Sequence, residues 1–222
     1  MNESLGIVET KGYVGNVERQ DGVELLIRAA RLVADELGRE TPQFTCIGSG
    51  SDLGRLRSVA RALDLEDVLE FTGRLPHDKA LERLSVCDIC VQPDPSNAFN
   101  DSCTMVKSLE YMALGKPVVA FDLRETRHAC GDAALYARPN SASDLAAKVI
   151  QLVRNPALRR RLGRAGTERI ERELSWETGE AALLRAYASL AFLAGRPGIS
   201  RRRRGSFRRP LRGRARRRPR PG

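Results

Sequence analysis

The chain has 222 residues, of which 41% are hydrophobic and 30% charged, so it can build a folded core rather than stay disordered throughout. The formal net charge of +10 is misleading, because residues 201–222 hold twelve arginines and no acidic residue and leave the rest at −2. No run of about 18 apolar residues occurs, and the first residues lack the basic and apolar parts of a secretory signal. A membrane-spanning or exported protein is therefore not expected.

Strand and helix signals alternate from residue 12 onward. Short apolar and β-branched runs predict strands at residues 12–17, 44–47, 68–71, 89–92, 117–121 and 134–136. Amphipathic stretches predict helices at 21–37, 52–63, 77–84 and 104–114, a helical turn near Thr126, and closing helices at 143–154, 156–174 and 176–193. Asp21 is predicted to cap the first helix and Gly38 to end it.

Repeated strand–helix units predict one doubly wound, Rossmann-like α/β domain. Its sheet is expected to be parallel, with helices on both faces and ligands at the carboxyl ends of the strands. We assign residues 1–11 to an N-terminal extension, 12–195 to this domain, and 196–222 to a disordered basic tail, because the arginine-rich sequence cannot bury a core.

Five cysteines are present, and an odd number without an export signal predicts reduced thiols in the cytoplasm. Cys87 and Cys90 form a CxxC pair that lacks further ligands at zinc spacing, so buried structural cysteines are expected and no metal site. The arginine tail adds the expectation of peripheral contact with an anionic membrane surface. His77 and His128 match no catalytic arrangement, and both are expected to face solvent.

Two segments have the residue types of an anion-binding site. The first, GSGSDLG at 48–54, is a loose dinucleotide fingerprint that a plain strand-to-helix turn explains as well, which leaves an NAD(P) oxidoreductase as a minor alternative. The second is the helix predicted at 104–114 with the irregular loop before it. At its start, Thr104, Met105 and Val106 offer free amides to an anion, and Lys107 adds a positive charge. Glu110 can accept two ribose hydroxyls, or it can form a solvated pair with Lys107.

The run TMVKSLEYMALGKPVVA at 104–120 resembles the nucleotide-sugar-binding segment of glycosyltransferase family 4, the retaining enzymes with two Rossmann-like domains in a GT-B fold. The resemblance extends from about residue 12 to 190. It includes GYVGNVERQDGVELLIRAA near the start and the closing SWE near the end. This resemblance implies that the chain is the C-terminal, donor-binding half of such an enzyme.

The resemblance also implies roles for individual residues. Glu110 matches the glutamate that binds the donor's ribose, and Arg74 falls where the family lines its base pocket. Gly15 matches the family's loop glycine, whose backbone lies near the donor phosphates. The helix tip that faces the pyrophosphate is matched by Thr104, Met105 and Val106. The family's first glutamate would fall at Ser102, next to Asp101. At two loop positions where the family often has an arginine and a lysine, this chain has Asn16 and Asp21. Arg19 or Lys107 is expected to supply the missing positive charge.

By the same resemblance, the chain is expected to take part in hexosyl or other glycosyl transfer from a nucleotide-diphospho-sugar, with retention of configuration and with neither metal nor cofactor. Such a step belongs to polysaccharide or glycoconjugate biosynthesis. The acceptor would bind to a separate domain or subunit, so this half is expected to be inactive alone, and no catalytic residue is assigned. Two alternatives stay open. One is a non-catalytic nucleotide-sugar-binding accessory module. The other is a polyanion binder that uses the tail without specificity for nucleic acid.

Overall fold

The structure is a computed structural model that describes residues 10–194, with side chains described as far as 190. Its contacts divide the chain into two units after Thr178. The first unit is an α/β fold, and the second is described only as the remainder of helix α8 (Trp176–Ala194). The predicted tail at 196–222 lies outside the described residues. The predicted N-terminal extension lies outside them too, except that Thr10 and Lys11 belong to the first strand.

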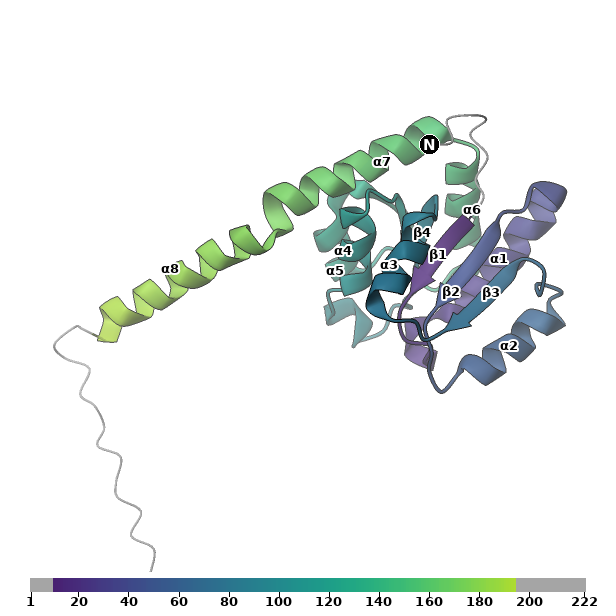
Figure 1. Ribbon diagram of the computed structural model, residues 1–222, viewed down its shortest axis with the longest axis horizontal. Helices are drawn as coiled ribbons and strands as arrows, with labels where there is room; N and C mark the ends of the chain where they lie inside the picture. The colour runs from purple at the N-terminus through teal and green to yellow at the C-terminus, as the bar shows by residue number, and fades with distance from the viewer. Residues whose placement is uncertain (1–9, 195–222) are drawn as a thin grey trace, which may run out of the picture. The chain divides into compact units, whose positions relative to one another are not determined.

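The first unit contains a six-stranded parallel sheet, as the sequence predicts (Figure 1). Its strands are β1 (Thr10–Val14), β2 (Gln43–Ile47), β3 (Leu69–Gly73), β4 (Ile89–Gln92), β5 (Val118–Phe121) and β6 (Ala134–Ala137). They lie in the order β3-β2-β1-β4-β5-β6, and the central strand β1 pairs with β2 on one side and β4 on the other. This order is that of a doubly wound sheet, which reverses its direction of winding between β1 and β4.

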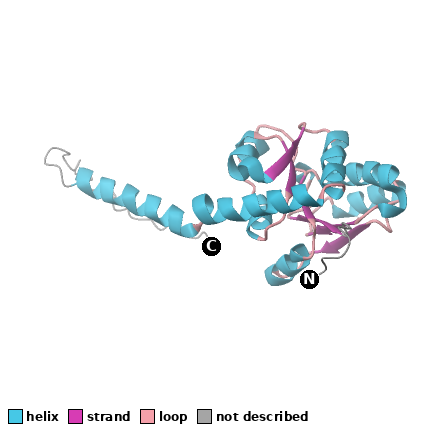
Figure 2. Cartoon of the chain, turned by 90° about the horizontal axis from the view of Figure 1, so that it is seen from above, coloured by secondary structure: helices cyan, strands magenta, loops and turns pink. Residues whose placement is uncertain are grey.

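Helices lie on both sides of this sheet (Figure 2). One face packs against α1 (Val23–Leu37), α2 (Leu53–Ala62) and α6 (Ala142–Val153). The other face packs against α3 (His77–Ser85), α4 (Val106–Ala113) and α5 (Arg124–Cys130). Helix α7 (Pro156–Arg169) contacts α4 and α6 and continues into a π-helical turn, Ile170–Leu174. None of the described helices is both long enough and apolar enough to cross a bilayer.

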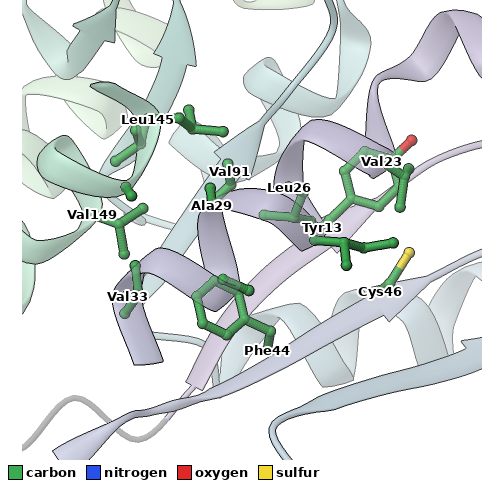
Figure 3. Close-up of a cluster of buried hydrophobic side chains, with 14 of the residues drawn as sticks. Tyr13, Val23, Leu26, Ala29, Val33, Phe44, Cys46, Val91, Leu145 and Val149 are labelled. Carbon is green, nitrogen blue, oxygen red and sulfur yellow. The ribbon is translucent and has the colours of Figure 1, made fainter. Parts of the chain in front are cut away.

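The strands are apolar at successive positions because both faces of the sheet are buried. In β4, Ile89 and Val91 face the cluster with α1, whereas Cys90 between them faces the cluster with α4. The buried side of α1 carries apolar residues at helical spacing. Figure 3 shows one of them, Val33, close to Phe44 of β2 and Val149 of α6. Burial of this kind stabilises the folded chain by about 25 cal/mol for each Å² of apolar surface removed from water.

The start of α1 differs from the sequence prediction. Its N-cap is Gly22 rather than Asp21, and Gly22 has a positive φ of 70°. A Cβ at Gly22 would lie 2.0 Å from the carbonyl oxygen of Pro93, so the close approach of two loops requires glycine there. Asp21 instead ends a 3₁₀ turn, Arg19–Asp21, and accepts a hydrogen bond from the Glu18 amide at 3.0 Å.

Lys11 is buried at 1% exposure in β1, and its ammonium has no hydrogen-bond partner among the described residues. Its Nζ lies 5.1 Å from the centre of the Phe44 ring. Burial lowers the pKa of Lys11 from 10.5 to about 7, against the attraction of Asp88. The folded chain therefore releases this proton at a lower pH than the unfolded chain does.

We expect the free energy of unfolding to rise between pH 7 and 9. In this range the unfolded chain keeps the Lys11 proton and the folded chain loses it, which gives a slope of at most about 1.4 kcal/mol per pH unit. Lys11→Met should remove this slope in urea denaturation at the two pH values. Equal slopes in both proteins would show that the folded chain keeps Lys11 charged.

Candidate functional site

The candidate site lies where the sheet reverses its winding, at the carboxyl ends of β1 and β4 (Figure 1). The connections from these adjacent strands leave in opposite directions, and a crevice at this point is the usual ligand site of a doubly wound sheet. Here the loop that begins at Gly15 follows β1, and the loop that begins at Pro93 follows β4 and leads into α4. The two sequence segments that were predicted to bind a donor therefore meet at this point.

The loop after β1 is held by the turn between β2 and α2. The amide of Gly15 donates to the Ile47 carbonyl at 3.0 Å, and the amide of Asp52 donates to the Val17 carbonyl at 3.1 Å. The amide of Ser51 donates to the Glu18 carboxylate at 2.8 Å. Two amides at the start of α2 are thus already occupied by the neighbouring loop. The geometry favours a plain structural turn at GSGSDLG over a dinucleotide site.

A pocket of about 740 Å³ opens beside this loop. Three of the predicted residues line it together, namely Gly15, Asn16 and Arg74. His77, at the start of α3, lines it as well, although the sequence analysis assigned it no role. Its position at the end of the short connection from β3 to α3 was the available signal, because the residues after each parallel strand gather at the same edge of the sheet.

Helix α4 begins two residues later than predicted. Met105 is its N-cap with an extended backbone, and the first helical residues are Val106 and Lys107. Thr104 therefore precedes the helix and is exposed. Met105 supplies no side-chain cap, so the leading amides of α4 lack the acceptor that a serine or aspartate would give them.

Lys107 forms a buried ion pair with Asp94. Its Nζ lies 2.7 and 3.0 Å from the two carboxylate oxygens of Asp94, and the two side chains are only 11% and 2% exposed. The same Nζ lies 5.2 Å from the centre of the Tyr13 ring. Burial raises the pKa of Asp94, which the nearby ammonium opposes. Asp94 was not among the predicted site residues, although it follows a fully buried strand in the motif VQPDPS.

Glu110 does not pair with Lys107, although they lie three residues apart on α4. Its side chain is half-buried, and its carboxylate has no ion pair or hydrogen bond among the described residues. Lys107 and Glu110 thus lie on the same helix, as predicted. Lys107 is paired with Asp94, whereas Glu110 is unpaired. A half-buried carboxylate without a partner can accept hydroxyl groups of a ligand.

Two tyrosines are hydrogen-bonded around the end of β1, Tyr111 from α4 and Tyr13 from β1 itself. The Val14 amide donates to the Tyr111 hydroxyl at 2.9 Å, and the Tyr13 hydroxyl donates to the Asn16 carbonyl at 2.5 Å. Burial raises the pKa of both phenols, so they stay protonated at neutral pH. The first bond ties the end of β1 to α4, and the second fixes the backbone of the loop that follows.

Seven of the ten predicted donor-binding residues lie outside the lining of the 740 Å³ pocket, namely Arg19, Ser102, Thr104, Met105, Val106, Lys107 and Glu110. Arg19 is exposed in the 3₁₀ turn and lies near Asp52, whose pKa it helps to lower. Ser102 donates to the Ala98 carbonyl at 3.2 Å and lines a second pocket of about 410 Å³ together with Asp101. One Asp101 oxygen accepts from Ser96, and the other is buried without a partner among the described residues.

Four of the five cysteines are buried, as predicted, and Cys103 is half-buried. Burial raises the pKa of Cys46 to about 12 and that of Cys87 to about 11. Thiols with raised pKa values are poor nucleophiles at neutral pH. The described residues include no group of three or more side chains placed to hold a metal ion.

Comparison with known proteins identifies the family. The sequence pattern of the family described as Glycosyl transferases group 1 matches residues 9–155. This match covers well over half of the chain. The chain belongs to this family of glycosyltransferases. The resemblance that the sequence analysis found in TMVKSLEYMALGKPVVA is thereby confirmed.

Curated relatives are 25–29% identical to the chain over the aligned residues. An uncharacterized glycosyltransferase of Methanocaldococcus jannaschii is 27% identical over 181 residues, which are 81% of this chain and 48% of that protein. A D-inositol 3-phosphate glycosyltransferase of Corynebacterium aurimucosum is 29% identical over 193 residues, which are 83% and 44% of the two chains. The chain therefore spans about half the length of the curated relatives that it matches.

Solved structures show the same fold. A sucrose-phosphate synthase from Thermosynechococcus elongatus matches with a TM-score of 0.71 and 24% identity, covering 86% of this chain and 47% of that one. The TarM protein of S. aureus, in a complex that contains UDP, matches with a TM-score of 0.71 and 20% identity, covering 85% and 36%. The six-stranded parallel unit is a Rossmann-like domain of the GT-B type.

We expect Gly48→Ala to destabilise the site loop. A Cβ at Gly48 would lie 1.8 Å from the Gly15 carbonyl oxygen, and its φ of +144° also disfavours other residues. The loss should be several kcal/mol in chemical denaturation, because backbone has to move. Gly54→Ala is the matched control, since nothing lies within 4 Å of its Cβ position. That variant should be neutral or more stable by about 0.5–1 kcal/mol, as expected in a helix. Similar effects of the two substitutions would contradict the close approach of the loops.

Proposed function

We propose that the chain is the donor-binding part of a retaining glycosyltransferase that needs no bound metal and transfers a glycosyl group from a nucleotide-diphospho-sugar. The observation that carries the proposal is the arrangement at the switch point. There the unpaired Glu110 carboxylate and the uncapped start of α4 belong to one helix, and Tyr111 of this helix is bonded to Val14, the last residue of β1 before the loop that begins at Gly15. Family membership supports the reaction class.

In this proposal the diphosphate lies between the loop after β1 and the first residues of α4. Amides at a helix start carry partial positive charge, and they stabilise the charge of a departing nucleoside diphosphate without a metal ion. The Gly15 amide itself is used by Ile47, so the phosphate-facing amides are those of Val106 and Lys107. Glu110 accepts the two ribose hydroxyls from the side of the helix.

The 740 Å³ pocket is the proposed site of the base. Its size is within the range of small-molecule sites, and Arg74 and His77 place polar groups at its rim. Several structures with the same fold are complexes with UDP, among them those of a pneumococcal O-GlcNAc transferase and a HepE protein from Anabaena. UDP is therefore the first ligand to test.

The acceptor is proposed to bind to a second domain or subunit. The curated relatives are about twice as long as the part that they share with this chain, which leaves room for a second domain in them. The accessory-module alternative makes the same binding prediction and differs only in turnover with a partner. The polyanion alternative rests on the arginine tail, which lies outside the described residues. The cytoplasmic location and the membrane-surface contact both stay predictions.

We expect Glu110→Gln to weaken UDP binding by roughly tenfold to a hundredfold in calorimetry, since hydrogen bonds to a charged group contribute about 1.5–3 kcal/mol. Glu66→Gln is the control, because Glu66 is exposed and pairs with Arg61 on the far side of α2. Circular dichroism should be unchanged in both. An unaltered affinity of the Glu110 variant would remove this residue from the site.

The 222-residue chain by itself is expected to bind nucleoside diphosphates and to transfer no sugar to simple acceptors. Positioning of two substrates contributes up to about 7–11 kcal/mol to a rate, and in this proposal a second domain or subunit positions the acceptor. The check is a radiolabelled transfer assay next to a binding assay on one preparation. Robust transfer by the purified monomer would require an acceptor site within this chain.

A further inference from the structure

We propose that Asp94 is a built-in counter-ion of the donor site, which occupies the Lys107 ammonium when no donor is bound and thereby keeps the affinity for the diphosphate moderate. The inference rests on the proposed function and adds a residue that sets the strength of donor binding. Asp94 acts through Lys107 and is a positioning residue rather than a catalytic one.

Lys107 is placed against the wall of the proposed phosphate site. Its Cε lies 3.3 Å from the position that a Cβ of Gly15 would take, and Gly15 lines the 740 Å³ pocket. Its Nζ rests over the ring of Tyr13, whose hydroxyl holds the carbonyl of Asn16. The sequence resemblance places two cations in the loop after β1, and this chain has Asn16 and Asp21 at those positions. Lys107 thus supplies from α4 the positive charge that the loop lacks.

The ion pair determines how much of this charge a ligand encounters. Asp94 is the more deeply buried partner, with 2% of its side chain exposed against 11% for Lys107. Both Asp94 oxygens are within hydrogen-bond distance of the Lys107 Nζ. The negative charge of the carboxylate therefore cancels most of the positive charge that the ammonium would present to a ligand. An incoming diphosphate has to share the ammonium with a resident carboxylate that repels it. In a partly buried site both effects are stronger than in water.

Other charged and titratable groups lie near the pair, among them Tyr111 of α4, which interacts with Asp94. Asp21 in the 3₁₀ turn acts on Asp94, Cys46 of β2 lies within the field of Lys107, and Tyr13 of β1 contacts it. Burial raises the pKa values of the thiol and the phenol, which leaves both neutral near pH 7.5. Asp21 is the second anion of the site, and it is held by the Glu18 amide.

The test is the affinity of the full chain for UDP, by calorimetry at pH 7.5, in four proteins: wild type, Asp94→Asn, Lys107→Met and the double variant. Asp94→Asn should bind UDP about tenfold or more tightly, because the ammonium is released and a like charge is removed. Lys107→Met should bind more weakly. In the Lys107→Met background the substitution of Asp94 should have no effect, since an unpaired buried carboxyl group is neutral.

The salt dependence gives a second readout that a purely structural role would not change. Asp94→Asn should lose affinity more steeply between 50 and 300 mM NaCl than wild type does, because it offers a net positive charge to the ligand. Unchanged or weaker UDP binding by a folded Asp94→Asn would overturn the counter-ion role. So would an equal effect of this substitution with and without Lys107.

Asp94→Asn leaves a buried ammonium without its partner, and the variant is at risk of failing to fold. For that case, the nitrogen resonance of Lys107 Nζ in the wild-type chain is followed during a UDP titration, assigned by its loss in Lys107→Met. A shift on saturation supports sharing of the ammonium, and an unchanged signal overturns it. If wild type binds neither UDP nor GDP nor ADP, the proposed function itself fails, an outcome distinct from an inert Asp94.

Discussion

The reversal of winding between β1 and β4 is the constraint on which the rest of the structure depends. Two adjacent parallel strands send their connections in opposite directions, so their carboxyl ends are left uncovered by a crossing helix. The loop after β1 and the loop before α4 occupy this place. Their contact is close enough that Gly22 has no room for a side chain beside Pro93. Glycine at that position is thus a consequence of the topology rather than of the chemistry.

The same crowding determines how polar groups are used. Glu18 and Asp21 hold the loop after β1, one through the Ser51 amide and the other through the Glu18 amide. In the resembling family, part of this loop supplies positive charge to the donor. In our proposal the loop contributes shape, and the positive charge comes from Lys107 on the neighbouring helix. A buried ammonium needs a partner, and Asp94 pairs with it in the structure.

Family membership and geometry answer different questions about this chain. The match over residues 9–155 places it among the glycosyltransferases of group 1, and the structural similarity shows the GT-B type of Rossmann-like domain. Neither comparison says which base, sugar or acceptor is used. The described side chains address donor binding, because Glu110 stands unpaired on the same helix on which Lys107 is paired with Asp94.

The sequence by itself determined the architecture, because hydrophobic periodicity and the repetition of strand and helix are local properties. The six strands were each predicted to within three residues, and the motif around Glu110 led to the correct family. The first turn of α4 was placed two residues early, since Thr104 and Met105 satisfy helical patterning without being helical. Only the tertiary structure decided the partners. Asp94 and Lys107 are thirteen residues apart, and His77 is more than sixty residues from Gly15. No local pattern shows which buried charges will meet, because their distances depend on how the strands are ordered in the sheet.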